Sequence, residues 1–226
     1  MHKIYPSILS GDFGCLAEEA KRLEEAGADA IHIDIMDGHF VPNLTLGPKA
    51  VAAINRSTSL FLDVHLMIYN PYDYVEAFVS SGADRVTFHF EATEDVEETI
   101  DFIRRCGAKA GVAFRPETSF DMIPKYLTMS DLVLIMTVSP GFGGQPFMRE
   151  MLEKVRLTRE HCSKHGIRQG GLVSNAALPP FDIQVDGGID ATTGRECVKA
   201  GANILVSGDF LFKKAKTLKD GIRELK

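Results

Sequence analysis

The chain has 226 residues, of which 45% are hydrophobic and 25% charged, and its formal net charge is −6. These proportions are ordinary for a globular protein, and the length suits one compact domain spanning 1–226. The acidic excess argues against nucleic acid or an anionic membrane as a partner, although a local anion site stays open. No apolar run approaches the ~20 residues that cross a bilayer, and the beginning of the chain lacks signal-peptide features.

Eight short β-rich runs alternate with longer helical patterns along the chain. We expect strands at 4–7, 30–34, 60–67, 85–90, 110–114, 132–136, 183–186 and 204–207. The first helical stretch places Leu16, Ala20 and Leu23 on one face, and Gly27 suits its C-terminus. A Gly-Ala-Asp or Gly-Ala-Asn connection then leads into the next strand, and this phrase recurs at 82–84 and 201–203. The alternation predicts repeated β-α units around a parallel sheet.

Such units can close into a barrel or form a doubly wound open sheet. Polar residues gather at the C-terminal ends of several predicted strands, where barrel enzymes carry their chemistry. No G-x-G-x-x-G follows the first strand, as a dinucleotide-binding sheet would require. We therefore predict an α/β protein with the (β/α)8 TIM-barrel fold in a single domain. The segment 168–182, with its Gly-Gly and Pro-Pro pairs, interrupts the rhythm and is expected to be a loop on the N-terminal face.

Polar and apolar side chains alternate in three of the predicted strands. His32 and Asp34 share one face of the second strand, which must be the barrel axis because the other face meets the helices. The third strand repeats the pattern with Asp63 and His65, and the seventh ends at Asp186. Two imidazoles and the two carboxylates of Asp34 and Asp186 thus converge without Lys or Arg in these segments, and the carboxylates would repel each other. A divalent cation resolves this conflict, and the donor set suits Zn²⁺, Fe²⁺, Co²⁺ or Mn²⁺.

Three glycine-bearing loops follow the last three predicted strands. The first is 139–145, SPGFGGQ, and the others carry Gly187-Gly188 and Ser207-Gly208. Glycines let backbone N–H groups approach an anion closely, and this end of a barrel often holds phosphate. The loops therefore predict a phosphate site.

Three methionines lie near the C-terminal ends of predicted strands, at Met36, Met67 and Met136. Methionine commonly fills gaps in a core. The other interpretation is an apolar collar that keeps water from a charged intermediate. Both interpretations stay open at the level of sequence.

Together these motifs resemble those of the ribulose-phosphate 3-epimerase family. The matching segments are PSILSGDF (6–13), HIDIMDGHFVPNLTLGP (32–48), DVHLM (63–67), TFHFEA (87–92), MTVSPGFGGQPFM (136–148), VDGGI (185–189) and AGANILVSG (200–208). They run from the first predicted strand to the eighth. The resemblance implies a metal-dependent isomerase of the pentose phosphate pathway that interconverts D-ribulose 5-phosphate and D-xylulose 5-phosphate. It also implies a cytoplasmic homo-oligomer.

The resemblance assigns roles to individual residues. His32, Asp34, His65 and Asp186 would bind one divalent ion per chain, with Zn²⁺ as the first choice. Asp34 and Asp186 would also be the catalytic pair, one removing and one returning a proton on either side of an enediolate that the metal stabilises. The residues implied to bind substrate are Ser7, His65, Gly141, Phe142, Gly143, Gly144, Asp186, Gly187, Gly188, Gly208 and Asp209.

Two features depart from the family pattern. Asp209 stands where a neutral residue is common, and a carboxylate ~4 Å from a phosphate is repulsive by about 4 kcal/mol at an effective dielectric near 20. Asp209 therefore points away, caps the following helix, or belongs to a site for another substrate. The insertion at 168–182 is also longer than the family suggests, which concerns packing or oligomer contacts rather than chemistry.

Rival functions share the barrel. The alternative within the class is a 3-epimerase of a six-carbon ketose phosphate such as D-allulose 6-phosphate. Decarboxylating barrels that resemble hexulose-phosphate synthases carry Asp-x-Lys-x-x-Asp on the third strand, where this chain has His65. A binding protein without catalysis would need no acid–base pair.

Overall fold

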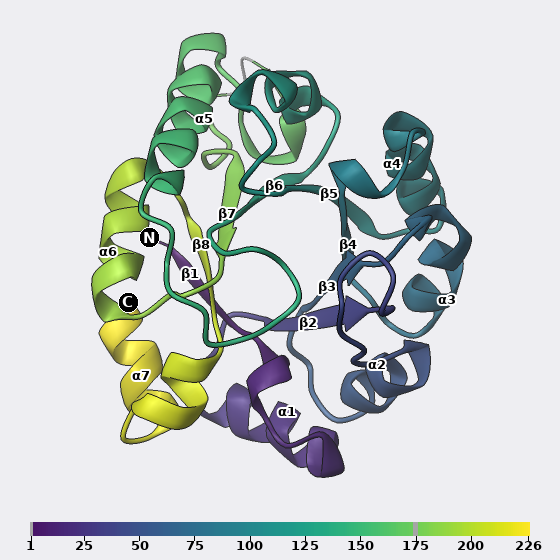
Figure 1. Cartoon of the computed structure of the whole chain (residues 1–226), viewed down its shortest axis with the longest axis vertical. Coiled ribbons are helices and arrows are strands. Elements are labelled where there is room, and N and C mark those ends of the chain that lie inside the picture. The colour runs from purple at the N-terminus through teal and green to yellow at the C-terminus, as the bar shows by residue number, and fades with distance from the viewer. Residues whose placement is uncertain (1, 174–175) are drawn as a thin grey trace.

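The computed structural model describes residues 2–173 and 176–226, and within them eight parallel strands surround one axis (Figure 1). The strands are β1 (Lys3–Pro6), β2 (Ile31–Met36), β3 (Leu62–Met67), β4 (Arg85–His89), β5 (Lys109–Phe114), β6 (Leu132–Met136), β7 (Asp182–Asp186) and β8 (Ile204–Ser207). Their order is β1-β8-β7-β6-β5-β4-β3-β2, and a parallel bridge between Ser7 and His32 joins the two ends. The predicted (β/α)8 barrel is confirmed.

Helices cover the outside of the barrel (Figure 1). They are α1 (Leu16–Glu25), α2 (Pro48–Asn55), α3 (Val75–Ser80), α4 (Val96–Arg105), α5 (Met151–His165), α6 (Ala191–Ala200) and α7 (Leu218–Leu225). Between β5 and β6 the expected helical pattern was wrong, because the chain forms only 3₁₀ turns at Phe120–Met122 and Pro124–Thr128. Pro116 and Pro124 lack the N–H that a continuous helix requires there. None of the described helices has the length and apolar character needed to cross a bilayer.

The apolar residues pack in two places that follow strand alternation. Outward-facing side chains such as Ile33, Val64 and Val112 meet the helices in the main core. Inward-facing side chains such as Leu132 and Ile204 fill the lower part of the barrel. The upper part of the interior carries polar groups instead, so the barrel is a packed core below and a site above.

Two loops lie at opposite ends of the barrel. The teal-green loop after β6 crosses in front of the barrel mouth (Figure 1). At the other end, the described part of 168–182 forms a loop that precedes β7, with isolated bridges from Ile167 to Val173 and from Arg168 to Pro180. The predicted loop is therefore confirmed for 168–173 and 176–181, whereas Asp182 already belongs to β7, and positions 174–175 lie outside the described residues.

Candidate active site at the mouth of the barrel

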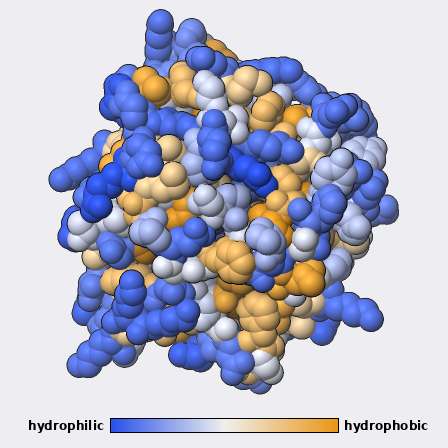
Figure 2. All heavy atoms as spheres, in the orientation of Figure 1, coloured by the Kyte–Doolittle hydropathy of each residue, from blue (hydrophilic) through white to orange (hydrophobic). Residues whose placement is uncertain are grey.

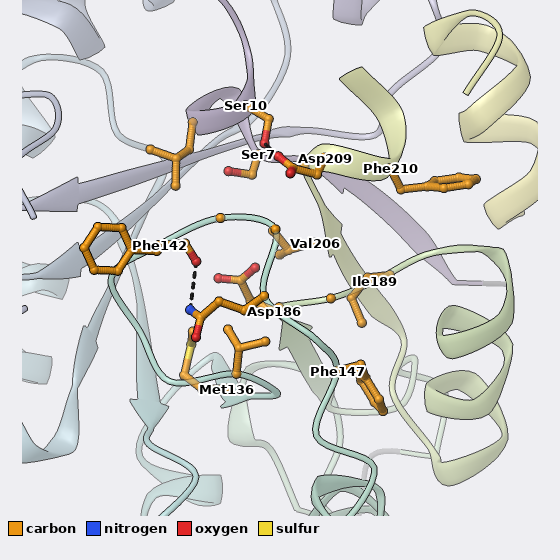
Figure 3. A pocket seen from close by; sticks show the side chains of 18 of the residues that line it. Ser7, Ser10, Met136, Phe142, Phe147, Asp186, Ile189, Val206, Asp209 and Phe210 are labelled. Carbon is orange, nitrogen blue, oxygen red and sulfur yellow. Dashed lines mark hydrogen bonds between the residues drawn. The ribbon is translucent and has the colours of Figure 1, made fainter. Parts of the chain in front are cut away.

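A cavity of about 420 Å³ opens at the C-terminal ends of the strands. Figure 2 shows apolar side chains gathered around the hollow at the centre of this face, with hydrophilic ones at the periphery. Figure 3 shows Asp186 inside the cavity, Ser7, Ser10 and Asp209 along one side, and Phe142 at its edge. The predicted residues that line it are Ser7, Asp34, Met36, Met67, Met136, Gly141, Phe142, Gly143, Gly144, Asp186, Gly187, Gly188, Gly208 and Asp209.

The four predicted metal ligands converge. One nitrogen or oxygen atom each from His32, Asp34, His65 and Asp186 lies within 4.8 Å of all the others. Asp34 Oδ1 is 3.3 Å from His32 Nε2 and 3.2 Å from His65 Nδ1, while Asp186 Oδ2 is 3.9 Å from both nitrogens. The strand register explains this geometry, because Asp34 on β2 pairs directly with His65 on β3. Both histidines are fully buried beneath the cavity floor.

One ring nitrogen of His32 lacks a hydrogen-bond partner. Its Nδ1 lies 2.8 Å from Asp63 Oδ2, whereas Nε2 is buried and forms no hydrogen bond with any described residue. A carboxylate only accepts, so Nδ1–H donates to Asp63 and Nε2 faces Asp34 and Asp186, where the neutral form of the ring would offer a lone pair to a cation. Burial opposes protonation of His32, but Asp34 and Asp63 raise its pKa well above the usual value. The site thus attracts positive charge.

The two carboxylates differ in protonation. Burial raises the pKa of Asp34, but His32 and His65 outweigh it and place that pKa well below the usual range. Burial and the Asp34 carboxylate raise the pKa of Asp186 to about 7. Ser7 Oγ donates to Asp34 Oδ2 at 2.6 Å and fixes that carboxylate. No Lys or Arg among the described residues pairs with either acid.

These observations fit a divalent cation. An orphaned buried imidazole nitrogen, a second imidazole and two like-charged oxygens face one volume. Imidazole and carboxylate donors in this number suit Zn²⁺ and its transition-metal neighbours. A cation would also favour the ionised form of Asp186.

A second buried charge group lies one layer deeper, and no sequence motif indicated it. Asp63 accepts from Arg85 Nε at 2.7 Å and from Gln184 Nε2 at 2.6 Å, and all three residues are buried. The Arg85 guanidinium also lies 5.5 Å from the ring centroid of Tyr5. Burial raises the pKa of Asp63, but Arg85 and His32 hold it well below its usual range. This acid is neutralised within the fold.

The glycine loops form one rim of the cavity. The backbone N–H groups of Gly143, Gly144 and Gly188 donate to no other described residue, so they are available to a ligand. A Cβ at Gly188 would lie 2.8 Å from the backbone nitrogen of Phe147, and one at Gly208 would lie 2.5 Å from Ser10 Oγ. Glycine at these two positions therefore permits close packing between neighbouring loops.

Asp209 lies on this rim rather than away from it. Its Oδ1 accepts from Ser10 Oγ and from Lys213 Nζ, each at 2.8 Å. A Cβ at Gly144 would lie 2.6 Å from Asp209 Oδ2, so the carboxylate abuts the glycine-rich loop. The side chain forms no cap hydrogen bond with the following helical turn. Both the outward orientation and the helix cap considered from the sequence are therefore wrong.

The three methionines belong both to the core and to the cavity wall. Met36, Met67 and Met136 are at most 4% exposed, so they fill the upper core, and all three line the cavity. Sequence reasoning missed two cations of the lining, Arg149 and Lys214. They stand outside the motifs, and only the fold of the β6 and β8 loops brings them to the rim.

Sequence reasoning also missed the surroundings of His65. The TFHFEA segment (87–92) carries His89, which contacts the far side of the His65 ring, and Glu91, which contacts His89 in turn. The segment matched the family, yet it gave no sign that these two side chains extend the site.

A (β/α)8 barrel with two carboxylates at its mouth is typical of enzymes that use general acid–base catalysis. A model of the ribulose-phosphate 3 epimerase family matches residues 3–212, and the chain belongs to this family. The ribulose-phosphate 3-epimerase of Chlamydia muridarum is 50% identical over 211 residues, covering 93% of this chain and 88% of the relative. The ribulose-phosphate 3-epimerase of Bacillus subtilis is 44% identical, and the match covers 94% of this chain and 93% of the relative.

Solved structures extend the likeness in fold alone. A 3-hexulose-6-phosphate synthase superimposes with a TM-score of 0.70 at 15% identity, covering 99% of this chain and 97% of the other. A tryptophan synthase α-subunit from Pyrococcus furiosus gives a TM-score of 0.69 at 16% identity, covering 100% and 99%. At such identities the barrel is shared and the chemistry is not implied.

Proposed function

We propose that the chain interconverts D-ribulose 5-phosphate and D-xylulose 5-phosphate by moving the proton at the carbon beside the ketone. The observation that carries the proposal is the pair Asp34 and Asp186 at the floor of a cavity of about 420 Å³. They come from β2 and β7, which β1 and β8 separate around the barrel. Inversion needs a base on one face of the carbon and an acid on the other, which two separated carboxylates supply.

The environments of the two acids divide the roles. Asp34, whose pKa lies below its usual range, is ionised and fit to accept the proton. Without a cation the pKa of Asp186 is raised to about 7, so of the two acids it is the one that holds a proton more readily and is fit to donate it. In the reverse direction the roles exchange.

One divalent cation per chain, Zn²⁺ as the first choice, would be held by His32, Asp34, His65 and Asp186. When bound, it supplies positive charge that stabilises the enediolate formed after proton removal. The His32 nitrogen without a partner supports this assignment. The three cavity methionines limit access of water to the reacting carbon.

The substrate phosphate would bind at the glycine rim. The free N–H groups of Gly143, Gly144 and Gly188 are donors suited to phosphate oxygens. Lys214 and Arg149 on the lining add positive charge. Ser7, Gly141, Phe142, Gly187 and Gly208 complete the surroundings of the ligand.

A coupled epimerase assay with purified, metal-replete protein tests the proposal. The panel contains D-ribulose 5-phosphate, D-allulose 6-phosphate and unphosphorylated ribulose. We expect the highest kcat/KM for the pentulose phosphate; a preference for the hexulose phosphate would overturn the substrate assignment.

We further propose a cytoplasmic homo-oligomer, in line with a rice relative called a cytoplasmic isoform, with light scattering as the test of assembly.

A further inference from the structure

We propose that His89 and Glu91 form a buried relay that holds the ring proton of His65 on Nε2 and so directs the Nδ1 lone pair into the site. The inference rests on the metal centre proposed above. Both residues belong to the end of β4 and the turn that follows it, Phe90–Ala92. They do not line the cavity and act only through His65.

Three side chains lie in a row behind the site. His65 Nδ1 faces the two aspartates, and its Nε2 lies 3.0 Å from His89 Nε2. His89 Nδ1 lies 3.2 Å from Glu91 Oε2. The rings of His65 and His89 stack with their centroids 5.0 Å apart, and His89 is fully buried.

This row permits one arrangement of protons when Glu91 is ionised and both rings are neutral. A carboxylate only accepts, so His89 Nδ1 carries the proton and donates to Glu91. The neutral His89 ring then has a lone pair on Nε2, which can only accept from His65 Nε2–H. This arrangement leaves the Nδ1 lone pair of His65 to a cation, which would replace the contact between Nδ1 and Asp34 Oδ1 at 3.2 Å.

Glu91 is anchored as an acceptor from outside the relay. Its Oε1 accepts from the Arg115 backbone N–H at 2.9 Å and from Thr118 Oγ. Burial raises the pKa of Glu91, but the hydrogen bonds with His89, Thr118 and Arg115 lower it to about 2. The loop itself is held by Lys154, whose ammonium donates to the carbonyls of Arg115, Pro116 and Thr118.

The other histidine of the site follows the same logic by a shorter route. His32 Nδ1 contacts Asp63 directly, which leaves Nε2 for the site. The two rings therefore offer opposite nitrogens, Nε2 of His32 and Nδ1 of His65, and each is oriented by a carboxylate behind it. Partners of this kind fix the tautomer of a metal-ligating imidazole, and their loss typically costs 10–100-fold in metal affinity.

Glu91→Gln gives the sharpest test. The Gln carbonyl oxygen would replace Oε1 opposite Arg115 N–H and Thr118, so the amide NH₂ would face His89 Nδ1. The proton positions then reverse along the row, and His65 Nδ1 becomes protonated. His89→Phe removes the relay and leaves His65 without a directed tautomer. Glu117→Gln, an exposed carboxylate in the same loop, is the matched control.

Two measurements are made on the whole chain. Ring-nitrogen NMR with ¹⁵N-labelled histidine reports which nitrogen of His89 carries the proton in metal-free protein. Competition with a chromophoric chelator gives the Kd for Zn²⁺. We expect His89 to carry Nδ1–H in the wild type and Nε2–H in Glu91→Gln. We expect Zn²⁺ affinity to weaken by about 10–100-fold in Glu91→Gln, with a smaller loss in His89→Phe and none in Glu117→Gln.

The outcomes separate the two proposals. Tight Zn²⁺ binding by the wild type, with Glu91→Gln and His89→Phe within about twofold of it, would overturn the relay and leave the metal centre intact. A wild type without measurable Zn²⁺ affinity would overturn the metal centre and the relay with it. If His89→Phe does not fold, Glu91→Gln decides alone.

Discussion

Two groups of buried charge lie one above the other inside the same barrel. The lower group is Asp63 with Arg85, and the upper group is Asp34 and Asp186 with two imidazoles. Asp63 and Arg85 form an ion pair at 2.7 Å, and their side chains are at most 3% exposed. The upper carboxylates have no Lys or Arg partner among the described residues.

The difference separates structural charge from functional charge. A buried charge must be paired, and the fold supplies Arg85 as the partner of Asp63. The same fold leaves the upper acids unmatched, and the pKa of Asp186 rises to about 7 as a consequence of burial and of Asp34. Two carboxylates without a counter-charge beside a cavity indicate a functional site, where a ligand can supply the missing positive charge. Four predictions test this contrast.

Removing divalent metal should have the largest effect, because it leaves the upper acids without a counterion. We expect complete chelation to abolish epimerisation and Zn²⁺ to restore it. The lower pair contains its own cation, so the fold should persist in circular dichroism. Elemental analysis before and after chelation reports occupancy; full turnover by protein shown to be metal-free would refute the assignment.

Replacing an upper acid should come next. Asp34→Asn or Asp186→Asn keeps the shape of the side chain but removes its basicity, so we expect kcat to fall by at least 10²–10⁴-fold. In Asp186→Asn the free energy of unfolding should change little or rise, because the repulsion between the two carboxylates is removed. Asp73→Asn is the control for the substitution, because Asp73 is an exposed acid in the 3₁₀ turn Pro71–Tyr74 that follows β3. Near-normal turnover in Asp34→Asn with metal bound would require a different base.

Breaking the lower pair should mainly reduce the free energy of unfolding, whereas replacing an upper acid mainly reduces kcat. Arg85→Met removes the guanidinium and leaves Asp63 buried without its cation, which typically costs about 3–5 kcal/mol in the free energy of unfolding. The double variant Arg85→Met with Asp63→Asn should recover part of this loss, because no unpaired charge remains. Urea unfolding measures both. A single variant within ~1 kcal/mol of the wild type would show that the lower pair is not a stabilising element.

The sequence predicts the upper group of residues better than the lower one. All eight strands lie within two residues of their predicted ends, and period-two alternation placed His32, Asp34 and His65 toward the axis. These features depend on local pattern. The Asp63–Arg85 pair depends on the register between β3 and β4, where the two residues are direct partners, and a single strand carries no information about it.

The orientation of single side chains and the local interruption of a helix are harder to predict from the sequence. Whether Asp209 turns toward the rim depends on Ser10, which is 199 residues away in the chain. The His89–Glu91 relay depends on rotamers and on a loop after β5. The missing helix between β5 and β6 shows that prolines can override an apolar pattern.

The smallest effect should come from Asp209→Ser, which tests whether an acid on the rim behaves like the matched lower group or the unmatched upper one. Lys213 Nζ lies 2.8 Å from Asp209 Oδ1, and Ser10 donates to the same oxygen. Burial raises the pKa of Asp209, but Lys213 and Ser10 lower it, so the carboxylate is ionised and already paired. A matched pair presents little net charge to a phosphate.

We therefore expect Asp209→Ser to change KM for ribulose 5-phosphate by less than about threefold and to leave kcat unaltered, because phosphate binding is nearly uniform between ground and transition states. Lys213→Met is the informative comparison, since it leaves the carboxylate unpaired beside Gly144 and should raise KM by roughly two- to fivefold, the scale of a surface ion pair. A steep rise of KM in Asp209→Ser would mean that the acid itself contacts the substrate. A fall well beyond threefold would mean that Lys213 does not neutralise it, and Asp209 would then resemble the upper acids despite its neighbour.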